Sequence, residues 1–113
     1  MTAWVKEISE DELAPSGMMA QGLWKRFVSD EPDGRGMIFG MGCLRPGEEV
    51  GHAHEEEELF FVLKGQGEAI WVTEDGEQHA ELRPGVAFYK TSNIHHRMRN
   101  TGDDVLVGLA FKI

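Results

Sequence analysis

Residues 51–65 read GHAHEEEELFFVLKG, with two histidines and four glutamates directly before an apolar run. Side chains on a strand alternate between its two faces, so His52, His54 and Glu58 point the same way if the extended path holds. Imidazole nitrogen and carboxylate oxygen together suit a divalent first-row transition metal. The stretch is either one edge of a metal site or a solvated acidic run. The metal site requires that another strand supplies a further ligand, whereas the acidic run does not.

Strand parity separates the four glutamates. Glu58 lies an even number of residues from His54, whereas Glu55 and Glu57 have the opposite parity and are expected to face solvent. Glu56 shares the parity of Glu58 and remains the alternative carboxylate.

The apolar run after Glu58 predicts a strand that is buried on both faces. Phe60 and Val62 share the face of Glu58, so they are expected to line the same interior space. The opposite face carries Leu59, Phe61 and Leu63. We expect this outer face to be covered by a second sheet, by residues 1–28, or by another subunit.

The chain has 113 residues, the size of a single domain with one hydrophobic core. Apolar residues make up 41%, and 14 glycines interrupt the chain, which favours a turn-rich β protein over a helical bundle. Eleven basic and twenty acidic residues give a net charge of −9. Such a chain repels a phosphate backbone, so no nucleic-acid partner is expected.

Cellular location is predicted from the cysteine count and the first residues. Cys43 is the single cysteine and cannot form an internal disulfide; it lies in an apolar stretch and is expected to be a buried small hydrophobe. The first residues lack the basic start and apolar core of a signal peptide. No apolar run reaches the ~18 residues of a membrane-spanning helix. We expect a cytoplasmic protein with no membrane partner.

Short alternating segments separated by turn residues predict an all-β fold. The expected strands cover residues 24–28, 36–44, 58–64, 68–74, 78–82, 86–89, 95–100 and 105–113. Asp75 and Gly76 form a strong hairpin signal. In the last strand Val105, Val107, Leu109, Phe111 and Ile113 share a face, which is predicted to be core. With no helix long enough for a crossover, the architecture is an antiparallel sandwich or barrel.

The start of the chain is predicted to precede the barrel. Ser9 and Glu12 have the spacing of a capping box, but Pro15 and Gly17 leave room for only one helical turn. Residues 1–17 are therefore interpreted as a lead-in segment, and residues 18–113 as a single barrel domain.

A further ligand is expected among the remaining histidines. His96 shares a strand face with Met98, whereas His95 shares the other face with Arg97 and Arg99. Because a face with two arginines is expected to be wet, His96 is the inward candidate, and a bulge would reverse this choice. His79 follows the hairpin and is interpreted as a solvated strand residue.

Two spaced motifs in this chain resemble those of the cupin superfamily. The first, G-x5-H-x-H-x3,4-E-x6-G, is matched by Gly47, His52, His54, Glu58 and Gly65, with the first gap one residue short. The second, G-x5-P-x-G-x2-H-x3-N, is matched by Gly85, His96 and Asn100, with Thr91 and Asn93 in place of the proline and glycine. Asparagine tolerates the left-handed region better than most residues. The resemblance implies an antiparallel double-stranded β-helix, the jelly-roll barrel of single-domain cupins of the cupin 2 type.

The resemblance also implies the ligand set His52, His54, Glu58 and His96 for one divalent transition metal. Iron, manganese, nickel, cobalt and zinc all accept these ligands. Neutral imidazoles are needed, so metal affinity is expected to fall below about pH 6.5. A metal with one carboxylate ligand carries a local charge of +1, which favours an anionic or polar oxygen ligand.

The substrate pocket is expected to include Phe60, Val62, Met98, Tyr89 and Trp24, although barrel packing explains the apolar ones equally simply. Open positions on the metal favour a small-molecule enzyme, either an oxygenase of the dioxygenase type or a lyase, isomerase or decarboxylase. The alternative is a non-catalytic module that binds a sugar or carboxylate, or a regulatory module. No catalytic base is identified, and a homodimer is expected.

Overall fold

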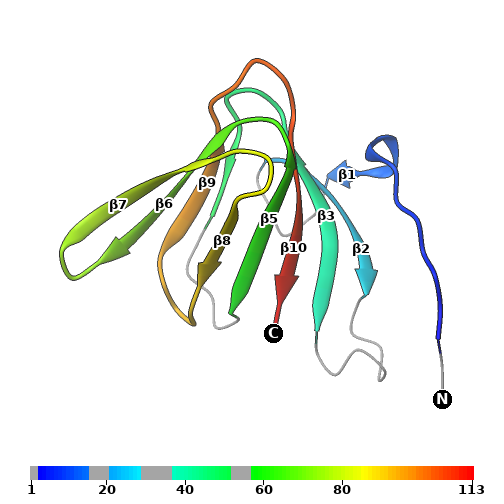
Figure 1. The fold of residues 1–113 in the computed structure, drawn as a ribbon, viewed down its shortest axis with the longest axis horizontal. Coiled ribbons are helices and arrows are strands. Elements are labelled where there is room, and N and C mark those ends of the chain that lie inside the picture. The colour runs from blue at the N-terminus through cyan, green and yellow to red at the C-terminus, as the bar shows by residue number, and fades with distance from the viewer. Residues whose placement is uncertain (1–2, 16–20, 29–36, 52–56) are drawn as a thin grey trace.

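A computed structural model describes residues 3–15, 21–28, 37–51 and 57–113 of the chain (Figure 1). These residues form a short 3-10 helix and ten strands, all paired antiparallel. The elements are η1 Glu10–Glu12, β1 Ala14–Pro15, β2 Leu23–Val28, β3 Ile38–Leu44, β4 Glu49–Val50, β5 Glu58–Lys64, β6 Gly67–Thr73, β7 Gly76–Leu82, β8 Ala87–Lys90, β9 His96–Asn100 and β10 Leu106–Lys112. The all-β prediction is confirmed, and the strands beyond the predicted set are the two-residue strands β1 and β4.

The strands form two sheets that face each other across one core. The larger sheet has the order β1-β2-β3-β10-β5-β8, and the smaller one has the order β4-β9-β6-β7. In Figure 1 the β6–β7 hairpin extends away from the larger sheet. Neighbours such as β10 and β5, or β9 and β6, come from distant parts of the sequence. This arrangement is the jelly-roll barrel that the motifs imply.

In the parts of the chain that the structure describes, helices long and apolar enough to cross a membrane are absent.

Small residues on the inner face of the larger sheet make room for aromatic rings. The indole of Trp24 lies over Gly40 and Gly42, where an added Cβ on Gly40 would come within 2.7 Å of that ring. The ring of Phe60 covers Gly108 in the same way, at 2.2 Å from an added Cβ. A side chain at Gly40 or Gly108 would therefore force the neighbouring ring to move.

The prediction for the last strand was wrong in its choice of face. The inner face of β10 carries Leu106, Gly108 and Ala110, all buried, whereas Ile113 on the predicted core face is 58% exposed. The larger apolar residues lie on the outside because the inner face needs small residues opposite the ring of Phe60. Val107 on the outer face is nevertheless buried.

Part of the outer face is covered by the lead-in. Leu13, with Ile8 beside it, packs in a second cluster with Cys43 and Val107. The Glu12 carboxylate accepts a hydrogen bond from the Ser9 backbone N–H at 2.7 Å, as the capping-box spacing predicts. Cys43 is buried as expected, and this burial raises the pKa of its thiol. Residues 10–15 thus form part of the barrel wall, with β1 paired to β2.

The loop before β9 adopts the conformation that the second motif requires. Asn93 has a φ of 60°, in the left-handed region, where the family motif has glycine. Among the described residues other than glycine it is the one with a positive φ. The asparagine therefore adopts a positive φ that glycine would adopt readily at this position of the motif.

Candidate metal centre

Glu58 and His96 meet in the interior of the barrel. Glu58 begins β5 in one sheet, and His96 begins β9 in the other. The Glu58 Oε2 atom lies 3.7 Å from His96 Nε2, and their side chains are 5% and 2% exposed. The parity argument is confirmed in that His96 points inward while His95 is exposed. Two predicted ligands, 38 positions apart by number (96 minus 58), are thereby brought together.

The His96 ring is oriented by contacts on its other side. Its Nδ1 atom lies 3.3 Å from the Ile94 carbonyl oxygen, and Phe88 stacks on the ring with centroids 6.2 Å apart. When Nδ1–H donates to this carbonyl, Nε2 carries the lone pair and faces Glu58. This tautomer is the one that a metal ligand needs.

His52, His54, Glu55 and Glu56 lie outside the described residues. The chain on either side of them is placed. Gly51 packs so closely on β9 that an added Cβ would lie 2.1 Å from the His96 carbonyl oxygen. Glu57 exchanges backbone hydrogen bonds with Ile113, at 3.0 and 3.2 Å. Both flanking residues thus border the strands that carry Glu58 and His96. The described parts of the chain contain no group of three or more His, Cys, Asp or Glu side chains that could hold a metal.

Two lysines flank Glu58, and sequence reasoning did not identify either. Glu58 pairs with Lys90 of β8 on one side and with Lys112 of β10 on the other. Lys90 is 3% exposed, and Lys112 Nζ lies 3.9 Å from Glu58 Oε2 with a side chain 21% exposed. Strand register, which sequence alone does not give, is what places them there.

The predicted pocket residues divide into two groups. Phe60, Val62 and Met98 are buried in the interior, and Trp24 packs against the same cluster. Tyr89 lies on the outer face of β8, 55% exposed, because strand alternation places it opposite Phe88 and Lys90. Tyr89 is therefore not part of the interior wall. Its hydroxyl donates to the Glu57 carboxylate, which raises the pKa of Tyr89.

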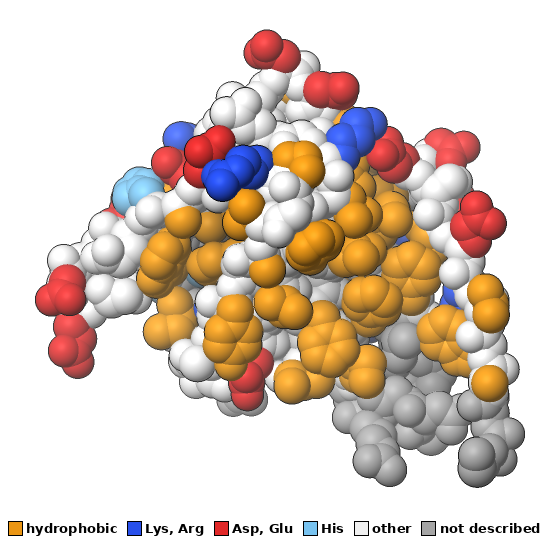
Figure 2. Space-filling view, viewed as in Figure 1, with side chains coloured by type: hydrophobic (Ala, Val, Ile, Leu, Met, Phe, Trp, Pro, Cys, Tyr) orange, Lys and Arg blue, Asp and Glu red, His pale blue; other side chains and the backbone are white. Residues whose placement is uncertain are grey.

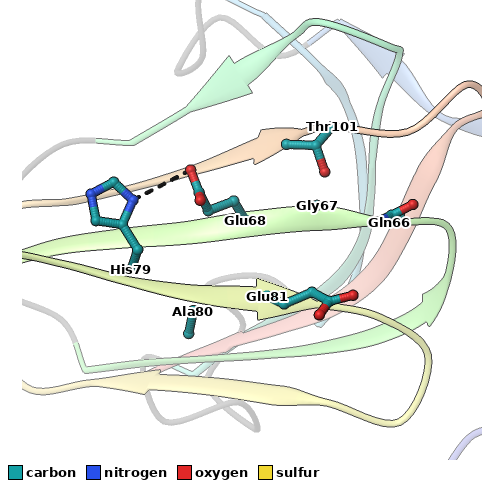
Figure 3. A pocket seen from close by; sticks show the side chains of 7 residues that line it. All are labelled: Gln66, Gly67, Glu68, His79, Ala80, Glu81 and Thr101. Carbon is teal, nitrogen blue, oxygen red and sulfur yellow. Dashed lines mark ion pairs between the residues drawn. The ribbon is translucent and has the colours of Figure 1, made fainter.

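A separate shallow pocket lies on the smaller sheet (Figure 3). Its lining residues are Gln66, Gly67, Glu68, His79, Ala80, Glu81 and Thr101. The His79 ring points toward Glu68, with Nδ1 at 3.4 Å from the carboxylate, and its Nε2 lies 3.0 Å from Glu77. His79 is half exposed, as its interpretation as a solvated strand residue predicts, and Glu68 is on the strand face opposite the barrel core.

Comparison with known proteins identifies the family. Residues 40–111 match the family model of the cupin domain, Cupin_2. Among solved structures, a Cupin 2 conserved barrel domain protein from Salinispora arenicola superposes with a TM-score of 0.77 at 16% identity, covering 99% of this chain and 89% of that one. A predicted oxalate decarboxylase from Thermotoga maritima also gives 0.77, at 23% identity, covering 96% and 98% of the two chains. These similarities concern the fold.

A curated relative matches a shorter segment. Glucose-6-phosphate isomerase from Thermococcus litoralis is 38% identical over an alignment of 64 residues, and the match covers 53% of this chain and 34% of that protein. The chain thus spans about a third of the length of this relative. The family match covers most of the barrel, including β5 and β9 with Glu58 and His96. The chain belongs to the cupin superfamily, in the Cupin_2 type of β-barrel domain.

Proposed function

We propose that the chain binds one divalent transition metal through His52, His54, Glu58 and His96. The observation that carries this proposal is the buried pair of Glu58 and His96, 3.7 Å apart and contributed by opposite sheets. A carboxylate oxygen and an imidazole nitrogen that lie side by side in the interior are donor atoms that a single ion can bind together. The histidine pair of the first motif supplies the remaining ligands by resemblance.

The two described donors fit such an ion. An imidazole nitrogen and a carboxylate oxygen are ligands that iron, manganese, nickel, cobalt and zinc accept. The Ile94 carbonyl holds the His96 ring, as a partner outside the ligand set does in many metal sites. When bound, the ion polarises a coordinated substrate oxygen, and iron also provides oxidoreductase chemistry of the dioxygenase type. The protein contributes an apolar interior wall that includes Phe60, Val62 and Met98.

We further propose that the chain is an enzyme whose small substrate carries anionic or polar oxygens. Two relatives support this substrate class. One is a predicted oxalate decarboxylase and the other a glucose-6-phosphate isomerase, and both named substrates carry anionic oxygens. A substrate oxygen near the metal would serve decarboxylase, isomerase, lyase and dioxygenase reactions alike. The proposal therefore specifies the kind of substrate and leaves these four types of reaction open.

Metal analysis of purified variants tests the ligand set. Wild-type protein is expected to bind one equivalent of metal, whereas Glu58→Gln and His96→Gln lose it. His95→Gln is the matched control, because it removes an exposed histidine from the neighbouring position. Wild-type protein that neither contains nor takes up stoichiometric metal would refute the proposal.

Activity is tested on the metal-loaded protein. Loss of substrate is followed by NMR with and without oxygen, over a panel of carboxylates, hydroxy acids, diketones and sugar phosphates. Turnover that disappears in His96→Gln and persists in His95→Gln supports an enzyme. Tight ligand binding without turnover across the panel identifies instead a non-catalytic binding or regulatory module.

We also propose that the chain forms a homodimer through the outer face of the larger sheet. Leu59, Phe61, Leu63 and Tyr89 are 39–55% exposed there, and Figure 2 shows hydrophobic side chains gathered over β8, β5, β10 and β3. A patch of this kind marks an interaction surface. Sedimentation is expected to give a dimer at micromolar concentration and a monomer for Phe61→Glu. A wild-type monomer would exclude the dimer.

A further inference from the structure

Glu58 lies at an end that three strands of the larger sheet share. It is the first residue of β5, and it pairs with Lys112 and Lys90, the last residues of β10 and β8. In Figure 1 this is the edge of the sheet at which the C-terminus is marked. Strand ends open at much lower free energy than the centres of buried strands. A ligand in this position therefore depends on contacts that fix the residue before it.

Backbone hydrogen bonds extend the sheet by one residue beyond Glu58. The Glu57 N–H donates to the Ile113 carbonyl at 3.0 Å, and the Ile113 N–H donates to the Glu57 carbonyl at 3.2 Å. Because Glu58 follows directly, the position of its own backbone depends on this pair. Successive side chains of an extended chain alternate between faces, so the Glu57 carboxylate is on the outer face and that of Glu58 is on the inner one.

Tyr89 holds Glu57 from the outer face of the sheet. Leu59 pairs with Tyr89 across β5 and β8, so Glu57 is the diagonal neighbour of the phenol ring on that face. The Tyr89 hydroxyl donates to Glu57 Oε2, and this hydrogen bond raises the pKa of Tyr89, so the phenol remains a donor at neutral pH. A hydrogen bond to a carboxylate is stronger than one between neutral groups.

We propose that Tyr89 is a positioning residue of the candidate metal centre, which acts by fixing Glu57 and, through it, the Glu58 ligand. This role rests on the metal site of the proposed function. Tyr89 is on the outer face and 55% exposed, whereas Glu58 is buried on the inner face, so the effect passes through the backbone of residues 57 and 58. Metal binding requires the first residue of β5 to be ordered, whereas the metal-free chain can open there. The hydrogen bond therefore favours the metal-bound state.

Calorimetric titration with Mn²⁺, Ni²⁺ and Zn²⁺ in turn tests the hydroxyl. Tyr89→Phe keeps the ring, and it is expected to weaken each ion that binds the wild type by about three- to tenfold, the effect of losing one modest hydrogen bond. Ser9→Ala is the matched control, because it removes an exposed hydroxyl that donates to the Glu12 carboxylate. The neighbouring Glu10 contacts Lys64, at the far end of β5 from Glu58, so Ser9→Ala should leave metal affinity unchanged.

A double-mutant cycle shows whether the hydroxyl acts through Glu57. Glu57→Ala removes the acceptor and one charge, so the metal affinity of this variant is the reference for the second substitution. Adding Tyr89→Phe to it is expected to change metal affinity by less than about twofold. Equal weakening by Tyr89→Phe in both backgrounds would refute the proposal, because the hydroxyl would then act by a route other than Glu57.

Amide exchange tests the same contact in the metal-free protein. Exchange of the Glu57 and Ile113 N–H groups with water, measured by NMR, is expected to be about three- to tenfold faster in Tyr89→Phe than in the wild type. Metal binding should slow it in both proteins. The Val62 N–H, which donates to the Val86 carbonyl within the buried part of β5, should exchange at an unchanged rate. Unchanged exchange at Glu57 and Ile113 would refute the role even if metal affinity fell.

Metal uptake and a monomeric background separate the ways of failing. Wild-type protein that takes up none of the ions refutes the proposed function, and the positioning role with it. Tyr89→Phe protein that binds metal as tightly as the wild type refutes the positioning role alone. Tyr89 also lies on the face proposed for the dimer, so the titrations are repeated with Phe61→Glu present. Loss of the Tyr89 effect in that background would refute the role, since Tyr89 would then act through the dimer contact.

Discussion

Strand β9 carries two buried polar residues on the same face, and their surroundings differ. Asn100 is 2% exposed, and its amide is held entirely by backbone: Nδ2 donates to the carbonyls of Leu44 and Asp104, and Oδ1 accepts from the Gly102 N–H, all at 2.8 Å. His96 is equally buried, but its Nε2 lies 3.7 Å from Glu58, beyond hydrogen-bond distance. Both residues belong to the second motif.

Within the second motif, Asn100 thus has a structural role, whereas His96 belongs to the candidate metal centre. The hydrogen bonds of Asn100 join β9 to the end of β3 and close the turn at residues 100–104, so this residue stabilises one end of the barrel. At the other end, ionisable groups lie near one another without short contacts between His96 and Glu58, the arrangement that an ion between them would complete. Substitutions around Asn100 are therefore expected to lower the stability of the fold, and substitutions around His96 are expected to weaken metal binding.

Asn100→Ala is expected to have the largest effect on folding. It leaves the Leu44 and Asp104 carbonyls and the Gly102 N–H without this partner, which costs roughly 3 kcal/mol of unfolding free energy. Urea titration of the metal-free protein measures it. The folded fraction of the variant should still bind metal with near wild-type affinity, and a loss below about 0.5 kcal/mol would contradict the structural role.

His96→Gln is expected to produce the opposite pattern. The side chain has a similar size, so unfolding of the metal-free protein changes by about 1 kcal/mol or less. With free metal at about 100 times the wild-type Kd, the wild type gains about 2.7 kcal/mol of stability. Removing a ligand weakens metal binding by at least about 100-fold, so the variant gains less than about 0.5 kcal/mol. A metal-dependent gain as large as that of the wild type would exclude His96 as a ligand.

Gly51→Ala addresses the junction between the histidine pair and β9. The added Cβ would come within 2.1 Å of the His96 carbonyl oxygen, so the backbone has to separate there. We expect a loss of about 1–2 kcal/mol in unfolding free energy and a weaker affinity for metal. Gly76→Ala is a control that loses stability far from the centre: its φ of 102° strains any side chain, although no atom lies within 4 Å of the added Cβ. Unchanged metal affinity would show that metal binding does not depend on the contact between Gly51 and the β9 backbone at His96.

Glu48→Gln is expected to have the smallest effect on stability. Glu48 lies at the end of the barrel where Asn100 is held. Hydrogen bonds from Arg45 hold the pKa of Glu48 below its ordinary value, and the Glu48 backbone carbonyl accepts from the Asn100 N–H. A lowered pKa in the folded state stabilises the protein above the unfolded pKa of about 4.3, and this contribution is lost as pH falls through the folded value. The substitution should therefore cost under about 1 kcal/mol at pH 7, and progressively less as pH falls below about 4.3.

Thermal unfolding across this pH range measures the Glu48 effect, with Glu81→Gln as the control for the change in net charge. A difference between wild type and Glu48→Gln that stays constant from pH 7 to pH 3 would show that the carboxylate charge is not responsible.

Alternation along single strands was sufficient to predict much of this molecule. It identified the buried face of β5 and distinguished His96 from His95, because each decision depends on neighbours within one strand. The strands β1 and β4 have two residues each and show no period, so their pairing was not predictable. The face of β10 was assigned wrongly because hydrophobicity does not reveal that Gly108 has to lie beneath the Phe60 ring.

The candidate centre was predictable only where it follows from spacing. The motif positions of Glu58 and His96 are readable from the sequence, and the structure brings these two side chains together. Lys90 and Lys112 were missed because their proximity to Glu58 depends on the register between strands that are distant in sequence: the two lysines are 32 and 54 positions from Glu58 (90 minus 58 and 112 minus 58). Tyr89 was placed in the pocket although its parity is opposite to that of Phe88.

The pairing of Glu57 with Ile113 makes the candidate centre sensitive to what is attached after the last strand. Backbone hydrogen bonds run in both directions between these two residues, next to Glu58 and Lys112. A polypeptide fused after Ile113 would leave the barrel close to Glu58, and a polyhistidine tag there would bring competing imidazoles to the candidate metal centre. A tag at the other end of the chain, followed by its proteolytic removal, keeps recombinant protein suitable for metal and ligand titrations.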